Sequence, residues 1–221
     1  MDIRIDQDTF FVFDLDDTLY QEIDFLRSAY KHISTELEPL LKRSIYQEML
    51  ERYQRKENVF QWIITEHREL LSDRNHAWLV SAYREHMPEI QLSVETKNFI
   101  ELARTMKIPM GVITDGRSVT QRNKLKALGI ADLFTDIIIS EEFGSEKPDE
   151  RNYSYFITKH PGKHFYYFGD NTTKDFITPA RLGWVTVCVK DRGENIHKQQ
   201  FTADVLPQFV INGFHEIRLV L

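Results

Sequence analysis

The chain has 221 residues, of which 42% are hydrophobic and 28% are charged, and its formal net charge is −6. This composition is typical of a globular protein with a sizeable core, and the negative charge excludes a general attraction to nucleic acid or to an anionic membrane. Cys188 is the one cysteine, so an internal disulfide and a thiolate zinc cluster are both excluded.

The N-terminal residues are charged and do not resemble a signal peptide, and no apolar run approaches the roughly 18 residues that a membrane span needs. We therefore expect a cytoplasmic protein with neither nucleic acid nor a membrane as its partner. The sequence leaves open whether the protein is a monomer or a homodimer.

The first predicted element is a strand at 10–13, where four apolar residues in a row suit a strand that is buried on both faces of a parallel sheet. Asp14, Asp16 and Asp17 follow it directly. Carboxylates this close raise one another's pKa unless a cation or a proton lies among them, and ligands bind at the carboxyl ends of such strands. The stretch indicates a divalent cation site, although an acidic turn that caps a helix would look the same by itself.

Residues 21–92 differ in character, because they contain no glycine and their apolar residues recur at helical spacing. We predict about four helices here, with breaks near Glu38-Pro39, 56–58 and 72–75. The expected domains are a helical cap at 21–92 and a catalytic core made of 1–20 and 93–221.

Strands and helices alternate from residue 93 onward. Strands are expected at 110–113, 137–139, 164–168, 184–189 and 208–211, and helices at 93–106, 118–128, 149–159, 178–182 and from about Gly213. Short apolar strands separated by helices predict an α/β fold, a doubly wound parallel sheet with a Rossmann-like core and right-handed crossovers.

Polar motifs follow four of the predicted strands in succession. They are Asp14-Leu15-Asp16, Thr114-Asp115, Lys147-Pro148, and Gly169-Asp170 with Asp175. Each motif has an ordinary explanation when taken singly, such as a turn or a surface lysine, but in a doubly wound sheet these loops converge on one crevice. Several carboxylates, a hydroxyl and a lysine in one crevice suit phosphoryl transfer, which needs a metal, a nucleophile and donors for phosphate oxygens.

On these motifs the chain resembles the haloacid dehalogenase superfamily of hydrolases, in the subfamily I branch whose helical cap follows the first motif. The Asp-x-Asp-x-Thr element is 14–18, the hydroxyl is Thr114, the lysine is Lys147, and the Gly-Asp-(x)4-Asp element is 169–175. The resemblance implies a magnesium-dependent phosphomonoesterase that acts on a small phosphorylated substrate. A sugar phosphate is the first expectation and a nucleoside monophosphate the second.

The resemblance also implies a role for each residue. Asp14 would attack phosphorus and form an aspartyl-phosphate, and Asp16 would protonate the leaving oxygen and later deprotonate the attacking water. Thr114 and the backbone near Asp115 would bind phosphate oxygens, and Lys147 would neutralise charge.

Magnesium is the implied cofactor, since it prefers oxygen ligands. Asp14 and Asp170 would bind it through carboxylates and Asp16 through its backbone carbonyl. Asp175 would act through a metal-bound water or by contacting the direct ligands without binding the metal itself.

Substrate specificity is expected to come from the cap, which would close over the site. Tyr20, Gln21 and Phe25, together with Glu22, are the candidates to contact the substrate. Packing within the cap is an equal alternative for Tyr20 and Phe25.

Four other functions share parts of this pattern. Members of the superfamily that cleave carbon–halogen bonds lack the second aspartate, so Asp16 argues for phosphoryl transfer. A sugar phosphomutase stays open because it shares the same core. The long helical insert argues against a signalling receiver domain, and the intact Asp14, Lys147 and Asp170 argue against a non-catalytic binding protein.

Overall fold

The computed structural model describes residues 1–71, 73–202 and 206–221, and the chain divides into two compact units. One unit comprises Met1–Ile23 and Gln91–Leu221, and the other comprises Asp24–Ile90. We call them the sheet unit and the helical unit. Within the described ranges, every helix is too short or too polar to cross a lipid bilayer.

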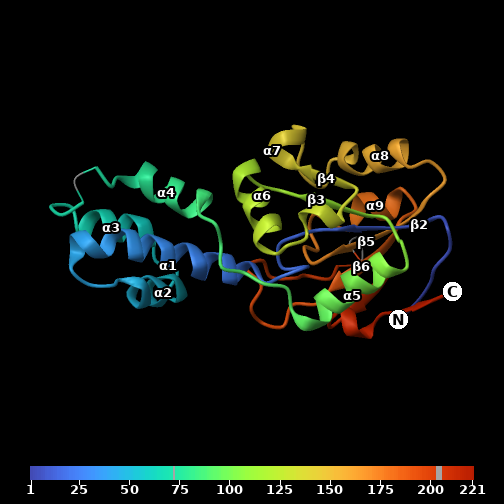
Figure 1. Ribbon diagram of the computed structural model, residues 1–221, viewed down its shortest axis with the longest axis horizontal. Helices are drawn as coiled ribbons and strands as arrows, with labels where there is room; N and C mark the ends of the chain where they lie inside the picture. The colour runs from blue at the N-terminus through green and yellow to red at the C-terminus, as the bar shows by residue number, and fades with distance from the viewer. Residues whose placement is uncertain (72, 203–205) are drawn as a thin grey trace. The chain divides into compact units, whose positions relative to one another are not determined.

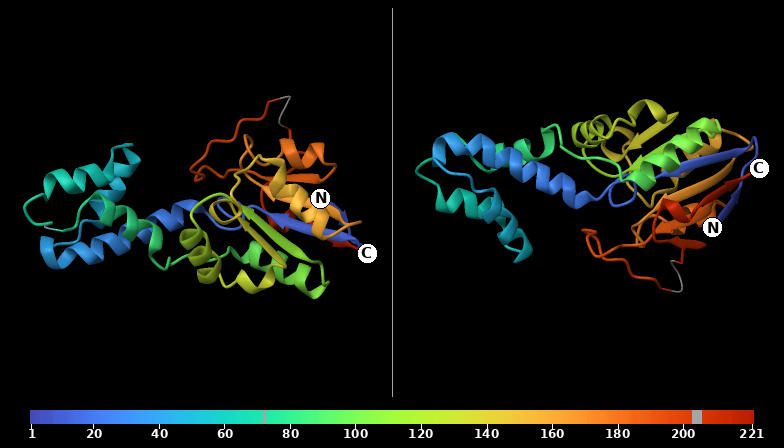
Figure 2. Two further views of the ribbon diagram at one scale, coloured as in Figure 1. Left: turned by 90° about the horizontal axis from the view of Figure 1, so that it is seen from above. Right: turned by 60° about the horizontal axis from the view of Figure 1, so that its bottom comes forward.

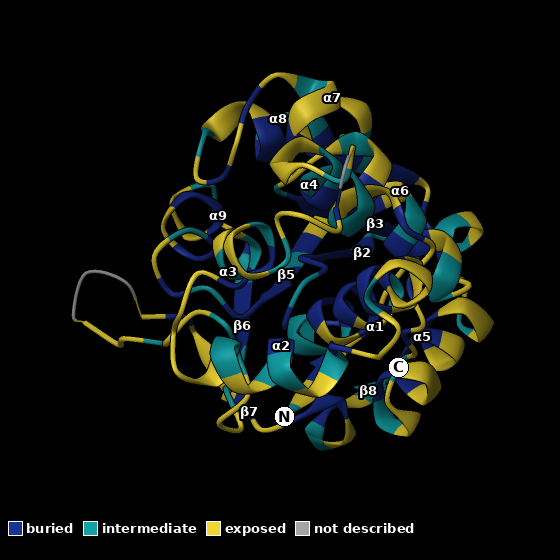
Figure 3. Cartoon of the chain, turned by 90° about the vertical axis from the view of Figure 1, so that its left-hand side faces the viewer, coloured by how far each residue is buried: buried dark blue, intermediate teal, exposed yellow. Residues whose placement is uncertain are grey.

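The sheet unit is built on a six-stranded sheet in which all neighbouring strands are parallel. Its order is β4 (Asp136–Ile139), β3 (Met110–Thr114), β2 (Thr9–Phe13), β5 (His164–Gly169), β6 (Val185–Val189) and β7 (Phe209–Ile211). All five residues of β2 are buried, as expected for the middle of such a sheet, and the strands form the dark centre of Figure 3. The predicted parallel α/β core is confirmed.

Helices cover both faces of this sheet (Figure 1). Successive β2 side chains point to opposite faces, so Phe11 stacks on Phe99 of α5 (Val94–Thr105) while Phe10 meets Phe156 of α8 (Glu150–Lys159) edge to face. The remaining segments of this unit are α6 (Ser118–Ala127), a 3-10 turn at Ala131–Leu133, α7 (Ser140–Phe143), α9 (Ile177–Arg181) and a second 3-10 turn at Phe214–Glu216. The α7 turn lies between the strand expected at 137–139 and the helix expected at 149–159, where the sequence predicts no element.

A second, two-stranded sheet joins β1 (Asp2–Arg4) to β8 (Arg218–Val220), so the two termini lie side by side (Figure 2). The expected closing helix from Gly213 is therefore wrong, because only the second 3-10 turn forms before the chain becomes extended. Pairing with β1 and the ion pair of Arg218 with Asp2 favour the extended form.

Two further expectations about helix ends are wrong. The break expected near Glu38-Pro39 falls later, because Pro39 lies inside the last turn of α1 (Glu22–Leu41), and Lys42, the first residue after the helix, has a positive φ of 57°. The helix expected at 178–182 begins one residue earlier, at Ile177, and the Thr178 hydroxyl donates to the carbonyl oxygen of Pro148 at 2.6 Å.

The helical unit contains most of α1 with α2 (Tyr46–Gln54), α3 (Val59–Glu66) and α4 (His76–Glu85). The predicted break at 56–58 is confirmed by the Asn58 side chain, which accepts a hydrogen bond from the backbone nitrogen of Gln61 and so caps α3. The break predicted at 72–75 includes Ser72, which lies outside the described residues.

Gly111 offers a test of the packing between β3 and α8. A Cβ atom there would overlap the ring of Phe156, so we expect Gly111→Ala to lower the free energy of unfolding by about 1–3 kcal/mol. Urea denaturation of both proteins would measure this. The penalty should shrink in a Phe156→Leu background, and an equal penalty in both backgrounds would contradict the proposed overlap.

Asp136 offers a test that depends on pH. Burial disfavours its charge, but hydrogen bonds from Lys159, His160 and Tyr155 outweigh burial and lower its pKa. A lowered pKa stabilises the fold above the unfolded value and this gain is lost as the pH falls through the folded value. We expect Asp136→Asn to cost about 1–3 kcal/mol at pH 7, with the difference from the original protein disappearing as the pH falls below about 4. A difference that is constant over this range would refute the assignment.

Candidate active site

A small cavity of about 110 Å³ opens at the carboxyl ends of the central strands. Its lining residues all belong to the sheet unit. They are Asp14, Asp16, Asp17, Glu22, Thr114, Asp115, Lys147, Asp170, Asn171, Lys174 and His197. The four predicted motifs therefore do meet at one place, as the order of the strands requires.

Lys147 connects two of these motifs. Its Nζ donates to Asp14 Oδ1 at 2.6 Å and to Asp175 Oδ1 at 2.8 Å, and all three residues are at most 5% exposed. Burial alone would lower the pKa of Lys147, but the carboxylates of Asp14 and Asp175 raise it well above its ordinary value. The lysine is thus a buried cation and not a solvated surface residue.

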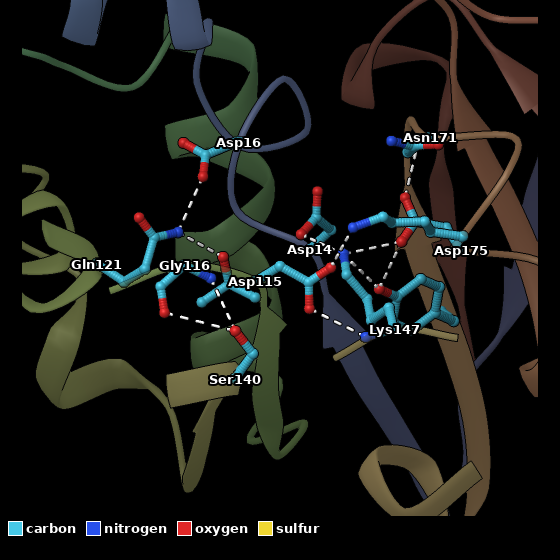
Figure 4. Close-up of polar contacts among 12 residues, drawn as sticks. Asp14, Asp16, Asp115, Gly116, Gln121, Ser140, Lys147, Asn171 and Asp175 are labelled. Atoms are coloured by element: carbon cyan, nitrogen blue, oxygen red, sulfur yellow. Dashed lines mark hydrogen bonds and ion pairs between the residues drawn. The ribbon is translucent and has the colours of Figure 1, made fainter. Parts of the chain in front are cut away.

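Asp115 holds Lys147 in this position. Its Oδ1 accepts a hydrogen bond from the backbone nitrogen of Lys147 at 3.0 Å, and its Oδ2 accepts one from Lys174 Nζ at 2.9 Å (Figure 4). The side chain of Asp115 therefore orders the loop after β4.

Asp175 is completely buried beneath the cavity. It also accepts hydrogen bonds from Tyr167 Oη at 3.1 Å and from the backbone nitrogen of Asn171 at 2.8 Å. A Cβ atom on Gly169 would lie 2.6 Å from Asp175 Oδ2. The glycine of the Gly-Asp-(x)4-Asp motif is thus required by the close approach of this carboxylate.

Asp14, Asp170 and Asp175 form the one acidic group, among the residues that the structure describes, that could hold a metal ion, with an oxygen of each within 4.8 Å of the others. Burial and the charge of Asp175 raise the pKa of Asp14 to about 7, despite Lys147. Burial and the charges of Asp14 and Asp175 raise the pKa of Asp170 to about 9. Buried carboxylates that oppose one another's ionisation fit a hard divalent cation, which would relieve the excess negative charge.

Thr114 ends β3 and is 1% exposed. Its Oγ1 accepts a hydrogen bond of 2.6 Å from Gln121 Nε2, so its own hydrogen remains available to donate to a ligand oxygen. Next to it, the backbone nitrogen of Gly116 donates to Ser140 Oγ at 2.9 Å (Figure 4).

The carboxylate of Asp16 is turned toward α6 and is absent from the group that could hold a metal (Figure 4). It accepts hydrogen bonds from Tyr20 Oη at 2.5 Å, Lys124 Nζ at 2.7 Å and Gln121 Nε2 at 2.8 Å. Burial disfavours its charge, but Lys124 and these hydrogen bonds outweigh burial and lower its pKa. In the protein alone, the carboxyl group of Asp16 is consequently more acidic than that of Asp14.

Several site residues lie outside the predicted motifs. Asn195 Nδ2 donates to Asp170 Oδ2 at 2.8 Å, and the backbone nitrogen of Ile196 donates to Asp17 Oδ2 at 3.0 Å, so the segment after β6 is bonded to the acidic motifs. For Gln121 and Lys124 a signal did exist, because they lie three residues apart and the helical period places them beside the buried Leu125.

The expected specificity residues differ in their surroundings. The hydroxyl of Tyr20 binds Asp16, Gln21 is partly exposed beside the start of α1, and Glu22 lines the cavity. Phe25 is 2% exposed and packs against Tyr83 and His86 inside the helical unit. This burial favours the packing role that the sequence left as an alternative for Phe25.

The model of the family described as haloacid dehalogenase-like hydrolase matches residues 11–189. A glyceraldehyde 3-phosphate phosphatase of Methanocaldococcus jannaschii is 32% identical over 124 residues, which are 55% of this chain and 52% of that protein. A pyrimidine 5'-nucleotidase of Escherichia coli is 26% identical over 115 residues, 51% of this chain and 49% of that protein. The chain thus spans about half the length of the curated relatives it matches.

Solved structures agree with this fold over nearly the whole chain. A HAD-hydrolase of Bacillus subtilis with bound magnesium has a TM-score of 0.66 at 21% identity and covers 94% of this chain and 96% of its own. A 2-haloacid dehalogenase from Pseudomonas syringae has a TM-score of 0.60 at 21% identity, and the match covers 93% of this chain and 94% of that protein's chain. Likeness at these identities concerns the fold alone.

Asp170 gives a test of the cation site that does not require catalysis. We expect Asp170→Asn to weaken the binding of Mg²⁺ at least tenfold, because a charged oxygen ligand is lost. Isothermal titration calorimetry with Mg²⁺ would measure the affinity, and Asp132→Asn, at an exposed aspartate, is the matched control. Equal affinities in the original protein and both variants would remove Asp170 from the cation site.

Proposed function

Because the chain belongs to the family of haloacid dehalogenase-like hydrolases, we propose that it is a phosphatase that hydrolyses a small phosphorylated metabolite through an aspartyl-phosphate on Asp14. The main support is the divergence of two carboxylates from a single turn. Asp14 lies against Lys147 and the acidic group, while Asp16, two residues later, lies against α6. One turn can therefore supply a nucleophile and a separate group that carries protons.

In the first step, an oxygen of Asp14 forms a bond to phosphorus while the bond from phosphorus to the leaving oxygen breaks. Asp16, which accepts three hydrogen bonds as a carboxylate and must therefore first bind a proton, gives that proton to the leaving oxygen. In the second step, a water oxygen bonds to phosphorus, the bond to Asp14 breaks, and Asp16 takes a proton from the water. Both carboxyl groups are thereby restored, so the cycle balances.

Lys147 and Thr114 support these steps electrostatically. The buried ammonium of Lys147 compensates Asp14, which would otherwise repel an anionic phosphate. Thr114 has a hydroxyl hydrogen to donate to a phosphate oxygen, since Gln121 occupies its acceptor side.

A magnesium ion fits the acidic group formed by Asp14, Asp170 and Asp175. When bound, such an ion polarises a phosphoryl oxygen and neutralises developing charge. Asp14 and Asp170 are the proposed direct ligands. Asp175 is already engaged by Lys147, Tyr167 and the backbone of Asn171, so we assign it the role of positioning Lys147.

The substrate class rests on the relatives and on the size of the site. The Methanocaldococcus jannaschii relative is named a glyceraldehyde 3-phosphate phosphatase, and the Escherichia coli relative is named a pyrimidine 5'-nucleotidase. The cavity within the sheet unit, at about 110 Å³, is suited to a phosphate group and little more. We therefore propose a sugar phosphate as the first substrate class to test and a nucleoside monophosphate as the second.

Dehalogenation is the competing chemistry, since a haloacid dehalogenase shares the fold. A departing halide needs no proton, whereas a departing alkoxide does. Asp16, which lines the cavity, has a carboxyl group that could carry this proton, which favours phosphate ester hydrolysis.

Phosphate release from sugar phosphates, nucleoside monophosphates and phospho-acids tests this proposal. We expect release that requires Mg²⁺ and that falls by at least a thousandfold in Asp14→Asn, because the amide is a poor nucleophile. Circular dichroism would check that the variant is folded. Conversion of a sugar phosphate to its isomer without release would indicate a mutase, and silence over the whole panel with Mg²⁺ bound would contradict the proposal.

A further inference from the structure

Helix α6 contributes two buried polar side chains to the site although neither lies in a predicted motif. Gln121 is 1% exposed and Lys124 is 3% exposed. A buried lysine has a high desolvation cost, so its position calls for a specific partner. Asp16 is that partner, with 2.7 Å between Lys124 Nζ and Oδ1.

The contacts on Asp16 come from two directions. Lys124 and Tyr20 both donate to Oδ1, while Gln121 donates to Oδ2. Both carboxylate oxygens are therefore held, and rotation of this side chain would break hydrogen bonds to α6 and to Tyr20. The amide nitrogen of Gln121 also donates to Thr114, so one side chain links the carboxylate to the expected phosphate-binding hydroxyl.

Glycine 116 makes the link with Gln121 possible. Its φ of +141° disfavours other residues, and a Cβ atom there would come within 3.2 Å of the Gln121 side chain. The turn after β3 thus leaves space for Gln121 beside Thr114. The turn at Gly116 and the helix α6 together place Gln121 and Lys124 so that both donate to Asp16.

We propose that Lys124 and Gln121 are positioning residues for proton transfer by Asp16. The inference rests on the proposed phosphatase function and extends it. Lys124 fixes Oδ1 and compensates the charge that remains after Asp16 has given up its proton, while Gln121 aligns that carboxylate with the phosphate-binding hydroxyl. Neither residue needs to touch the substrate.

This role predicts a dependence on the leaving group. An alkyl phosphate needs a proton on its leaving oxygen, whereas the nitrophenolate of p-nitrophenyl phosphate departs readily without one. Both substrates use the same Asp14 and the same cation. A residue that acts only through Asp16 should therefore affect kcat/KM for the alkyl phosphate selectively.

The test compares Lys124→Met with Lys126→Met, which removes an exposed lysine from the same helix. We expect Lys124→Met to lower the ratio of kcat/KM for an alkyl phosphate to that for p-nitrophenyl phosphate by about tenfold or more. Lys126→Met should leave the ratio unchanged, and Lys124→Arg should restore part of it. Combined with Asp16→Ala, Lys124→Met should have no additional effect on the ratio.

Different failures are distinguishable. Loss of kcat/KM by the same factor for both substrates would make Lys124 merely structural and would overturn this inference alone. An original protein that releases phosphate from neither substrate would overturn the proposed function as well. If Lys124→Met does not fold, Gln121→Leu gives the same comparison, with the ratio again expected to fall.

Discussion

The site depends on compensating several buried carboxylates at one edge of a sheet. Asp14, Asp170 and Asp175 approach one another closely in a buried environment, where isolated charges are costly. Lys147 supplies one compensating charge by bridging Asp14 and Asp175. The pKa values of Asp14 and Asp170 remain raised even so, which means that Lys147 alone does not balance the group. The loops around the acidic group place Lys147 between Asp14 and Asp175 and leave the group able to bind a further positive charge.

Asp14 and Asp16 show how one turn can create two electrostatic environments. Their side chains diverge, so Asp14 shares Lys147 with a second carboxylate while Asp16 has Lys124 and two neutral donors of its own. The pKa is consequently raised at Asp14 and lowered at Asp16. A cation bound beside Asp14 would act on the first carboxylate more than on the second. The contrast between them is thus set mainly by neighbours from the loop before α8, from the loop after β5 and from α6.

Much of the fold and the principal site residues could be predicted because strongly apolar strands end directly in polar motifs. Such a boundary is informative for Asp14, Thr114 and Asp170, since the packing of apolar side chains gives no reason for a polar or charged residue at the end of a buried strand. Lys124 was not predicted, because a lysine in an amphipathic helix is ordinarily solvated. Asn195 and Ile196 were not predicted either, since a side-chain amide and a backbone nitrogen in an irregular segment follow no period. The pairing of β1 with β8 escaped prediction because three-residue strands at opposite ends of the chain offer almost no pattern.

The central position of β2 in the sheet determines when, during folding, the residues of the candidate active site come together. This strand precedes the helical unit, yet Phe11 pairs with Met110 on one side and with Tyr166 on the other. Closing loops of about a hundred residues or more is entropically costly and makes such contacts slow to form. Contacts within the helical unit close shorter loops, such as that from Phe25 to Tyr83, so this unit is able to form earlier. During synthesis, Asp14 leaves the ribosome long before Lys147 and Asp170, and an incomplete chain carries the proposed nucleophile without the lysine that compensates its charge. Assembly of the sheet is therefore also the event that would complete the proposed catalytic site.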